Sequence, residues 1–225
     1  RKINKIYLNN CYSIAVLIIL QGIIGWYMVK SGLVYDVTVS HYRLSLHLLT
    51  AVFIISSLFW LIKNVNEKKE KFFFNFSKKY FLFQLLLIII FTQIILGAFV
   101  SGLDAGKIYQ TWPMMGEYFF PNDLIIRNVT DLIELNNHSL VQFYHRIFAY
   151  LIIVYTFFLT FIIYKKDLKH LYKPINIMLG IVSLQIILGI FTLISGLNIF
   201  LASAHQITGV ILVFSALNLY YLNVN

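Results

Sequence analysis

Long apolar runs, separated by shorter polar stretches, recur along the whole chain. Several of these runs reach the roughly 20 residues that a helix needs to cross the hydrocarbon core of a bilayer. They are too long and too uniformly apolar for the strands of a transmembrane barrel, which alternate and run to about ten residues. The pattern predicts an all-α, polytopic transmembrane helical bundle with six spans, at residues 12–30, 43–62, 80–101, 141–164, 175–195 and 200–221.

The composition agrees with an integral membrane protein. Of the 225 residues, 60% are hydrophobic and 12% are charged, and the mean hydropathy is +0.79. A soluble domain is nearer half apolar and a quarter charged, and the apolar excess here is too widely spread to be one signal peptide. The single cysteine, Cys11, cannot form an internal disulfide, and we expect it to be a small buried residue.

The basic residues cluster at one set of span ends. Thirteen of the 18 Lys and Arg residues, but only three of the nine acidic residues, lie before the first span, between the second and third, and between the fourth and fifth. The positive-inside rule makes this the cytoplasmic or matrix face, with both termini on that side. The net charge of +9 therefore reflects membrane orientation. A nucleic-acid partner is not expected, because no basic patch gathers on one soluble face.

One long connection, residues 102–140, lies on the opposite, outer side. Ordered connections of this length are usually functional. Its aromatic side chains suit a cap at the outer membrane surface. These aromatics are Tyr109, Trp112, Tyr118, Phe119 and Phe120.

A short motif occurs three times, in the first, third and fifth spans: "QGIIGWYMVKSGL", "QIILGAFVSGL" and "QIILGIFTLISGL". Each copy has a glutamine, a glycine four residues later, and Ser-Gly-Leu near the outer end of the span. The glutamines are Gln21, Gln93 and Gln185, the first glycines are Gly25, Gly97 and Gly189, and the later glycines are Gly32, Gly102 and Gly196. We expect the first glycines to let helices approach closely and the later ones to end each helix in a left-handed conformation. The chain is thus predicted to repeat a pair of outward and returning helices.

Each returning span carries a histidine at a similar depth. His47 and His145 are the fifth residues of their spans and His205 is the sixth, so each lies about 7 Å inside the outer boundary. Ionisable groups within spans are costly and are usually functional. Two facing neutral imidazoles form the usual low-spin haem site of a helical bundle. A purely hydrogen-bonding role and a three-histidine zinc site are the alternatives, although Phe, Leu and Ile walls favour a large apolar, planar ligand.

Two arginines and the remaining histidines lie near these three positions. Arg43 and Arg146 can pair with a haem propionate or extend to lipid phosphate. His41 and His138 are expected to be solvated at the outer surface, and His170 to be a surface residue of the inner side. Asp104 is expected to cap a turn, and the alternative is that it orients a haem or a proton path.

Motifs for other chemistries are missing from the sequence. There is no glycine-rich phosphate loop, no nucleophilic serine elbow and no His-Glu-x-x-His zinc signature. The predicted spans also contain no carboxylate, which argues against a proton-driven transporter with a buried acidic relay.

Five blocks together resemble the haem A synthase family. They are "VKSGL", "VSHYRLSLHL", "GAFVSGLDAGKIYQTWPMMG", "VQFYHRIFAY" and "LASAHQ", in that order. The resemblance runs through essentially the whole chain, and its most specific parts are the Trp-Pro loop and the His145 helix.

This resemblance implies an eight-helix protein built from two four-helix halves, each with a histidine pair facing the outer side. The family oxidises a methyl group of haem O to a formyl group, which gives haem A for cytochrome c oxidase. One half holds a haem b that passes electrons, and the other half receives the substrate. By motif, His145 and His205 resemble the axial ligands of the cofactor haem iron, with Arg146 also on the cofactor side. His47 resembles a catalytic histidine of the substrate side, with Arg43 binding substrate beside it.

The sequence departs from the family at its start. The family's first two helices, with a Glu-x-x-His-Arg motif that supplies the other substrate-side histidine, have no counterpart here, and the outer cysteine pair of some members is missing. We therefore expect residues 1–79 to be the remaining helix pair of the substrate half, and residues 80–225 to be the four-helix cofactor half. The chain is expected to be a fragment or one product of a split gene.

The functional prediction is a haem-dependent oxidoreductase with haem b as cofactor and haem O as substrate. Expected partners are membrane lipid, an electron donor that the sequence does not identify, and either a haem O synthase or a chain supplying the missing helices. The expected location is the mitochondrial inner membrane or a bacterial plasma membrane, with the haem sites toward the outer side. A non-enzymatic bis-histidine haem-binding or electron-transfer subunit fits the residues equally well without the family resemblance, and a haem transporter is a third reading.

Overall fold

The computed structural model describes residues 5–32, 39–74 and 77–224, and six long helices make up most of this part of the chain. They are α1 (Lys5–Gly32), α2 (His41–Glu67), α3 (Phe81–Gly102), α4 (His138–Lys165), α5 (Tyr172–Ile194) and α6 (Ile199–Asn223). Three short 3₁₀ helices lie in the connections: η1 (Ala105–Lys107), η2 (Val129–Ile133) and η3 (Lys169–Leu171). All six long helices are long and apolar enough to cross a membrane, so the prediction of a six-span, multi-pass membrane protein is confirmed.

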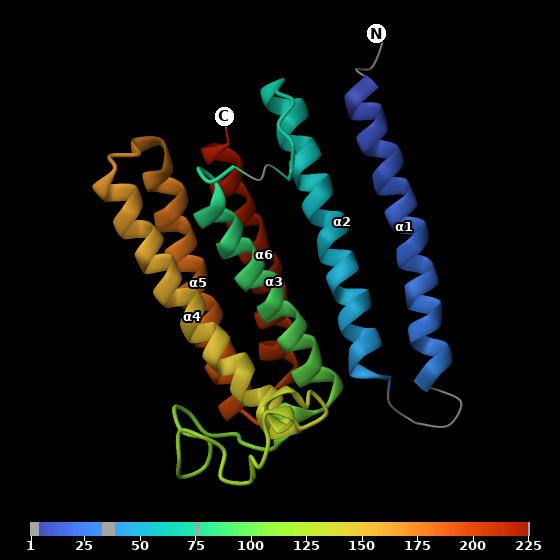
Figure 1. Cartoon of the computed structure of the whole chain (residues 1–225), viewed down its shortest axis with the longest axis vertical. Helices are drawn as coiled ribbons and strands as arrows, with labels where there is room; N and C mark the ends of the chain where they lie inside the picture. The colour runs from blue at the N-terminus through green and yellow to red at the C-terminus, as the bar shows by residue number, and fades with distance from the viewer. Residues whose placement is uncertain (1–4, 33–38, 75–76, 225) are drawn as a thin grey trace.

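The helices lie side by side and alternate in direction (Figure 1). The start of α1, the end of α6 and the two basic connections lie at one end of the molecule, and the loop between α3 and α4 lies at the other. We call these the inner and outer ends, following the charge pattern. The arrangement agrees with the prediction that both termini share one side.

Helices α3, α4, α5 and α6 form a four-helix ring. Each packs against its two neighbours, in the order α3, α4, α5, α6 and back to α3, so that α4 and α6 lie diagonally across the ring. Helix α2 packs on the outside of this ring, against α3 and α6, and α1 packs chiefly against α2. Much of the surface of α1 is therefore left uncovered by other helices. Cys11 is on such a face and is exposed, so the expectation that it is buried is wrong.

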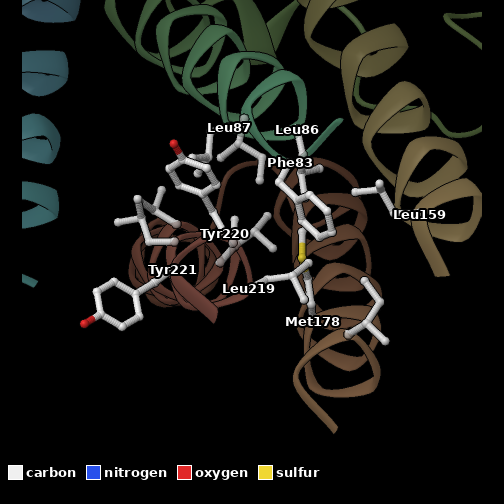
Figure 2. Close-up of a cluster of buried hydrophobic side chains, with 14 of the residues drawn as sticks. Phe83, Leu86, Leu87, Leu159, Met178, Leu219, Tyr220 and Tyr221 are labelled. Carbon is white, nitrogen blue, oxygen red and sulfur yellow. The ribbon is translucent and has the colours of Figure 1, made fainter. Parts of the chain in front are cut away.

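The main apolar core fills the inner half of the ring. All four helices contribute to it, for example through Phe83, Leu159, Met178 and Leu219 (Figure 2). Trp60 extends the cluster from α2, with its ring centroid 5.3 Å from that of Tyr220. The outer halves of α5 and α6 differ, because none of residues 183–207 is buried. The inner core thus fixes the helices relative to one another, and the outer halves of α5 and α6 are less closely packed.

A lysine in the inner connection fastens the end of α6. The Nζ atom of Lys71 donates to the main-chain oxygens of Tyr221, at 2.9 Å, and of Val224. Its own main-chain oxygen accepts from Trp60 Nε1 at 2.8 Å and from Asn64 Nδ2 at 2.9 Å. A cation at a helix C-terminus satisfies unpaired carbonyls and opposes the negative end of the helix dipole. Burial in this position lowers the pKa of the Lys71 ammonium.

The glycines at the outer helix ends serve two different purposes. Gly196 has φ +72°, which confirms the predicted left-handed conformation after α5. The prediction of a left-handed end is wrong for Gly102, because α3 ends at this residue and the next residue, Leu103, has φ −94°. A Cβ at Gly102 would lie 2.8 Å from Cβ of His41, so the glycine permits a close approach of α2. Helix α1 ends at Gly32, and the segment after it lies outside the described residues.

Candidate functional site

Each of the three histidines of the returning helices lies against a glycine of the preceding helix. His47, His145 and His205 are on α2, α4 and α6, and they face Gly25, Gly97 and Gly189 on α1, α3 and α5. A Cβ added at these glycines would lie 3.0, 3.2 and 2.9 Å, respectively, from Cε1 of the facing imidazole. The repeat predicted from the sequence is therefore a repeated structural unit, in which the glycine makes room for the ring.

The glutamine of each motif contacts the same histidine. Nε2 of Gln21 is 2.9 Å from the main-chain oxygen of His47, 3.1 Å from its Nδ1 and 3.4 Å from its Nε2. Nε2 of Gln93 donates to the main-chain oxygen of His145 at 3.0 Å.

In the third copy, Nδ1 of His205 donates to the main-chain oxygen of Gln185 at 3.1 Å, and the Gln185 side-chain nitrogen is 3.4 Å from His205 Nε2. We call each glutamine–glycine pair a histidine seat: Gln21–Gly25, Gln93–Gly97 and Gln185–Gly189. The sequence predicted close helix packing at these glycines but missed the contacts of the glutamines, for which the fixed Gln-to-Gly spacing was the available signal.

His145 and His205 belong to the diagonal helices of the ring. Both are half-buried, and the two imidazoles are near enough to interact electrostatically. The bond from His205 Nδ1 leaves Nε2 unprotonated, as an acceptor that the Gln185 side-chain nitrogen approaches at 3.4 Å. An imidazole binds iron through an unprotonated nitrogen of this kind. Nδ1 of His145 is buried without a hydrogen-bond partner. Two imidazoles on opposite helices of a bundle are the arrangement in which a haem is bound between two histidine ligands.

A zinc site made by all three histidines finds no support. Among the described residues, no group of three or more His, Cys, Asp or Glu side chains is placed to hold a metal ion. Each histidine belongs to its own helix pair, and His47 lies outside the four-helix ring. The three positions are equivalent by repetition and do not converge on one point.

His47 and an apolar groove lie on different faces of α2. The groove, of about 340 Å³, is lined by Leu46, Leu49, Thr50 and Phe53 of α2 and by Phe91 of α3. The His47 ring is half-buried and rests on the α1 seat. This histidine therefore faces surroundings different from those of the pair inside the ring.

Arg146 binds the outer loop. Its Nη1 donates to the main-chain oxygens of Thr111, at 2.9 Å, and Met114, at 3.2 Å, and its Nη2 donates to that of Tyr109 at 2.9 Å. Its Nε is buried without a partner. Both ends of the guanidinium are thus used to hold the loop over α4, a role that the sequence did not suggest. Propionate binding by Arg146 stays a prediction.

Arg43 links the outer ends of α1 and α2. Its Nη1 donates to the main-chain oxygen of Tyr27 at 3.3 Å, and the guanidinium carbon lies 4.0 Å from the centroid of the Tyr27 ring. Arg43 precedes His47 by four residues on α2 and therefore lies about one helical turn nearer the outer end. Substrate binding by Arg43 stays a prediction.

Side chains on the loop and the start of α4 fix the outer loop further. The Tyr109 hydroxyl donates to Asp123 Oδ1 at 2.7 Å, and the Ser139 hydroxyl donates to Asp123 Oδ2 at 2.6 Å. Partial burial raises the pKa of Asp123, but these hydrogen bonds outweigh it and hold the pKa below its usual value. Gln142 Nε2 also donates to the Tyr109 main-chain oxygen at 2.8 Å. The loop is therefore an ordered cap over the outer end of the ring.

Asp104 and His41 depart from expectation. The Asp104 side chain makes no capping hydrogen bond and instead pairs with Lys107 Nζ at 2.8 Å. His41 is buried, with its ring centroid 5.1 Å from that of Phe99, so the prediction that it is solvated is wrong. The reason is the close approach of α2 to Gly102, which encloses the first turn of the helix. His138 and His170 are exposed, as predicted.

Comparison with known proteins identifies relatives along nearly the whole chain. The chain is 44% identical over 222 residues to a haem A synthase of Pelagibacter ubique (strain HTCC1062), covering 97% of this chain and 64% of that protein. It is 41% identical over 219 residues to a haem A synthase of Wolbachia pipientis wMel, covering 96% and 61%. It is 36% identical over 217 residues to a haem A synthase of Rickettsia prowazekii (strain Madrid E), covering 94% and 63%. The chain spans less than two thirds of the length of each of these relatives.

A family model also matches most of the chain. The model describes the cytochrome oxidase assembly proteins (COX15-CtaA), and it matches residues 1–217. The match includes all three histidine seats and the outer loop. The chain belongs to the cytochrome oxidase assembly protein family.

Proposed function

We propose that this chain carries the haem-holding half and part of the substrate side of a haem A synthase, an oxidoreductase that converts the methyl group of haem O into the formyl group of haem A. The observation that carries the proposal is the pair of seated histidines, His145 and His205, on diagonal helices of a family member. Relatives that match over nearly the whole chain are named haem A synthases.

The resident cofactor proposed here is haem b, held through Nε2 of His145 and His205. When bound, it would supply one-electron transfer. The chain's own contribution is to orient the two imidazoles. The seats hold them in position, and the outer loop, fastened by Arg146 and Gln142, covers the outer end of the ring and limits access of water.

On the substrate side we propose that His47 contacts haem O and that Arg43, one turn further out, pairs with a substrate carboxylate. We further propose that residues 1–79 and 80–225 are the substrate and cofactor halves, with both haem sites toward the outer side of the membrane.

The test is to identify the haems bound to the purified chain. The chain is expressed together with a source of haem O and purified in detergent, and its haems are extracted and separated by chromatography. Haem A in the extract, lost in His47→Ala while haem b is retained, is the expected result. The matched control is His170→Ala, on the exposed inner connection.

A second candidate function is a non-enzymatic haem-binding or electron-transfer subunit, which the His145–His205 pair fits without any turnover. Haem b alone, at about one per chain, with no haem A under any condition would favour this candidate. An extract that contains no haem would contradict both.

A further inference from the structure

Three side chains of α4 bind one segment of the outer loop. Gln142, Arg146 and Tyr150 follow one another at intervals of four residues, so they lie on one face of the helix. Gln142 Nε2 donates to the main-chain oxygen of Tyr109 at 2.8 Å. The Tyr150 hydroxyl accepts from Trp112 Nε1 at 3.2 Å. Arg146, between them on the helix, donates three hydrogen bonds to the same segment. This segment therefore lies along one face of α4 and over the arginine.

The positive charge of Arg146 is not neutralised by a carboxylate. Its three hydrogen bonds go to main-chain oxygens, which carry no net charge. In the part of the chain that the structure describes, every ion pair joins a lysine to a carboxylate, and Arg146 is in none of them. A guanidinium keeps its proton in proteins. Because Arg146 is half-buried beneath an ordered loop, solvent and salt screen its charge less than they screen a surface charge.

This charge lies beside one of the proposed haem ligands. Arg146 follows His145 directly in the chain, and its guanidinium is near enough to the imidazole to interact with it electrostatically. A haem site carries one more positive charge with ferric than with ferrous iron. A fixed cation nearby therefore disfavours the ferric form. Two unit charges on the order of 10 Å apart, at an effective dielectric constant of about 20, shift such an equilibrium roughly tenfold.

We propose that the Arg146 guanidinium, fixed by the outer loop, keeps a positive charge beside His145 and so raises the reduction potential of the haem that His145 and His205 hold. The inference rests on the proposed function for the presence of that haem, but it does not depend on turnover of haem O. It gives the loop a second role besides covering the ring, because the loop carbonyls hold the charge in place without cancelling it.

The test is a spectroelectrochemical titration of the full chain with its haem bound, in which redox mediators deliver one electron to each haem iron. Arg146→Gln removes the charge and keeps an amide that can donate to a loop carbonyl. Its equilibrium constant for reduction is expected to fall about tenfold, which is a potential about 59 mV lower for one electron. Arg146→Lys keeps the charge, so its equilibrium constant should stay within about threefold of the wild-type value. A wild-type potential in Arg146→Gln would overturn the proposal.

Two matched controls separate the charge from the fastening of the loop. Arg127→Gln makes the same chemical change at an exposed position of the same loop, where screening by solvent and salt should leave the potential unchanged. Gln142→Met removes one hydrogen bond to the loop and no charge, so it should also leave the potential unchanged. If Gln142→Met lowered the potential as much as Arg146→Gln does, a loosened loop would be the cause and the proposal would be wrong.

The proposed function and this inference can fail separately. A lowered potential in Arg146→Gln, in a chain that never forms haem A, would count against the synthase and leave the inference standing. Haem A formed by a chain whose potential does not respond to Arg146→Gln would do the reverse. A purified chain that contains no haem would contradict both.

Discussion

The inner and outer halves of the four-helix ring are built differently, although the same helices run through both. On α5 the buried residues are Ile175, Met178 and Val182, all in its inner half, and on α6 the buried residues begin at Thr208. Helix packing in a membrane depends on close van der Waals contact, because lipid already solvates apolar side chains. The inner half therefore holds the bundle together. The outer half, which contains the Gln93–Gly97 and Gln185–Gly189 seats and the loop, is where we place the proposed haem ligands.

The largest effect is expected from His145→Ala. If His145 and His205 bind haem as proposed, removing one of them should abolish the bis-histidine absorption bands, because one imidazole alone cannot give that spectrum. The unfolding of the haem-free chain should hardly change, since His145 lies outside the inner core. Absorption spectra of the purified proteins check this. A bis-histidine spectrum retained in His145→Ala would show that the ligand has been assigned to the wrong residue.

The converse is expected from Leu159→Ala in the inner half of α4. Leu159 is fully buried, at 0% exposure, and its replacement should lower the free energy of unfolding by about 2–5 kcal/mol through the cavity it leaves. The haem spectrum should stay that of the wild type. Val154→Ala, at a position 64% exposed on the same helix, is the control and should change the free energy of unfolding by less than about 0.5 kcal/mol. Both values come from reversible denaturation in detergent. If Leu159→Ala lost haem before it lost helicity, haem binding would depend directly on the inner core, and the two halves would not have separate roles.

A pair of glycine substitutions on α5 tests the seats. A Cβ at Gly189 would lie 2.9 Å from Cε1 of His205, whereas one at Gly180 would meet no atom within 4 Å. Gly189→Ala should therefore displace the imidazole at a cost of about 1–3 kcal/mol and weaken haem binding. Gly180→Ala should leave haem binding unchanged and stabilise the helix by up to about 1 kcal/mol. Haem titrations of the two variants give the comparison, and equal affinities would mean that the seat does not constrain His205.

The inner half was the easier part to predict from the sequence. Apolar runs of about 20 residues indicate spans wherever they pack, so all six helices were found. Helices α1, α2, α4 and α6 were predicted too short at both ends, because polar residues such as His41 and His138 continue the helix beyond the apolar run. The recurrence of the histidines and of the Gln-to-Gly spacing also needs no knowledge of the fold.

The outer half depends on contacts between residues far apart in the chain. Burial of His41 follows from its approach to Gly102, and Arg146 is held by loop carbonyls about 35 residues earlier in the chain. The sequence indicates that an arginine, a loop and three glutamines are present, but it does not indicate which atoms meet. Recurrence predicted three equivalent histidines. The structure gives them three different hydrogen-bonding environments.

The smallest effect is expected at the loop that covers the outer half. Hydrogen bonds from Ser139 and Tyr109 hold the pKa of Asp123 below its unfolded value, so the carboxylate stabilises the docked loop above the usual Asp pKa of about 3.9. This contribution is lost as the pH falls through the lower, folded value. Because Asp123 is exposed, solvent screening keeps the effect under about 1 kcal/mol.

Limited proteolysis of the outer loop as a function of pH measures this contribution. Asp123→Asn should make release of the loop depend less on acid. Some dependence should remain, because main-chain N–H groups also lower the pKa of Asp131 in the same loop. Asp104→Asn, which breaks only the exposed ion pair with Lys107, is the matched control. If both variants release the loop at the same pH as the wild type, the loop is held chiefly by the bonds from Arg146 and Gln142 to main-chain oxygens. The loop would then be fixed to α4 as stably as the helices are fixed by the inner core. The two halves would differ only in the space around the histidines.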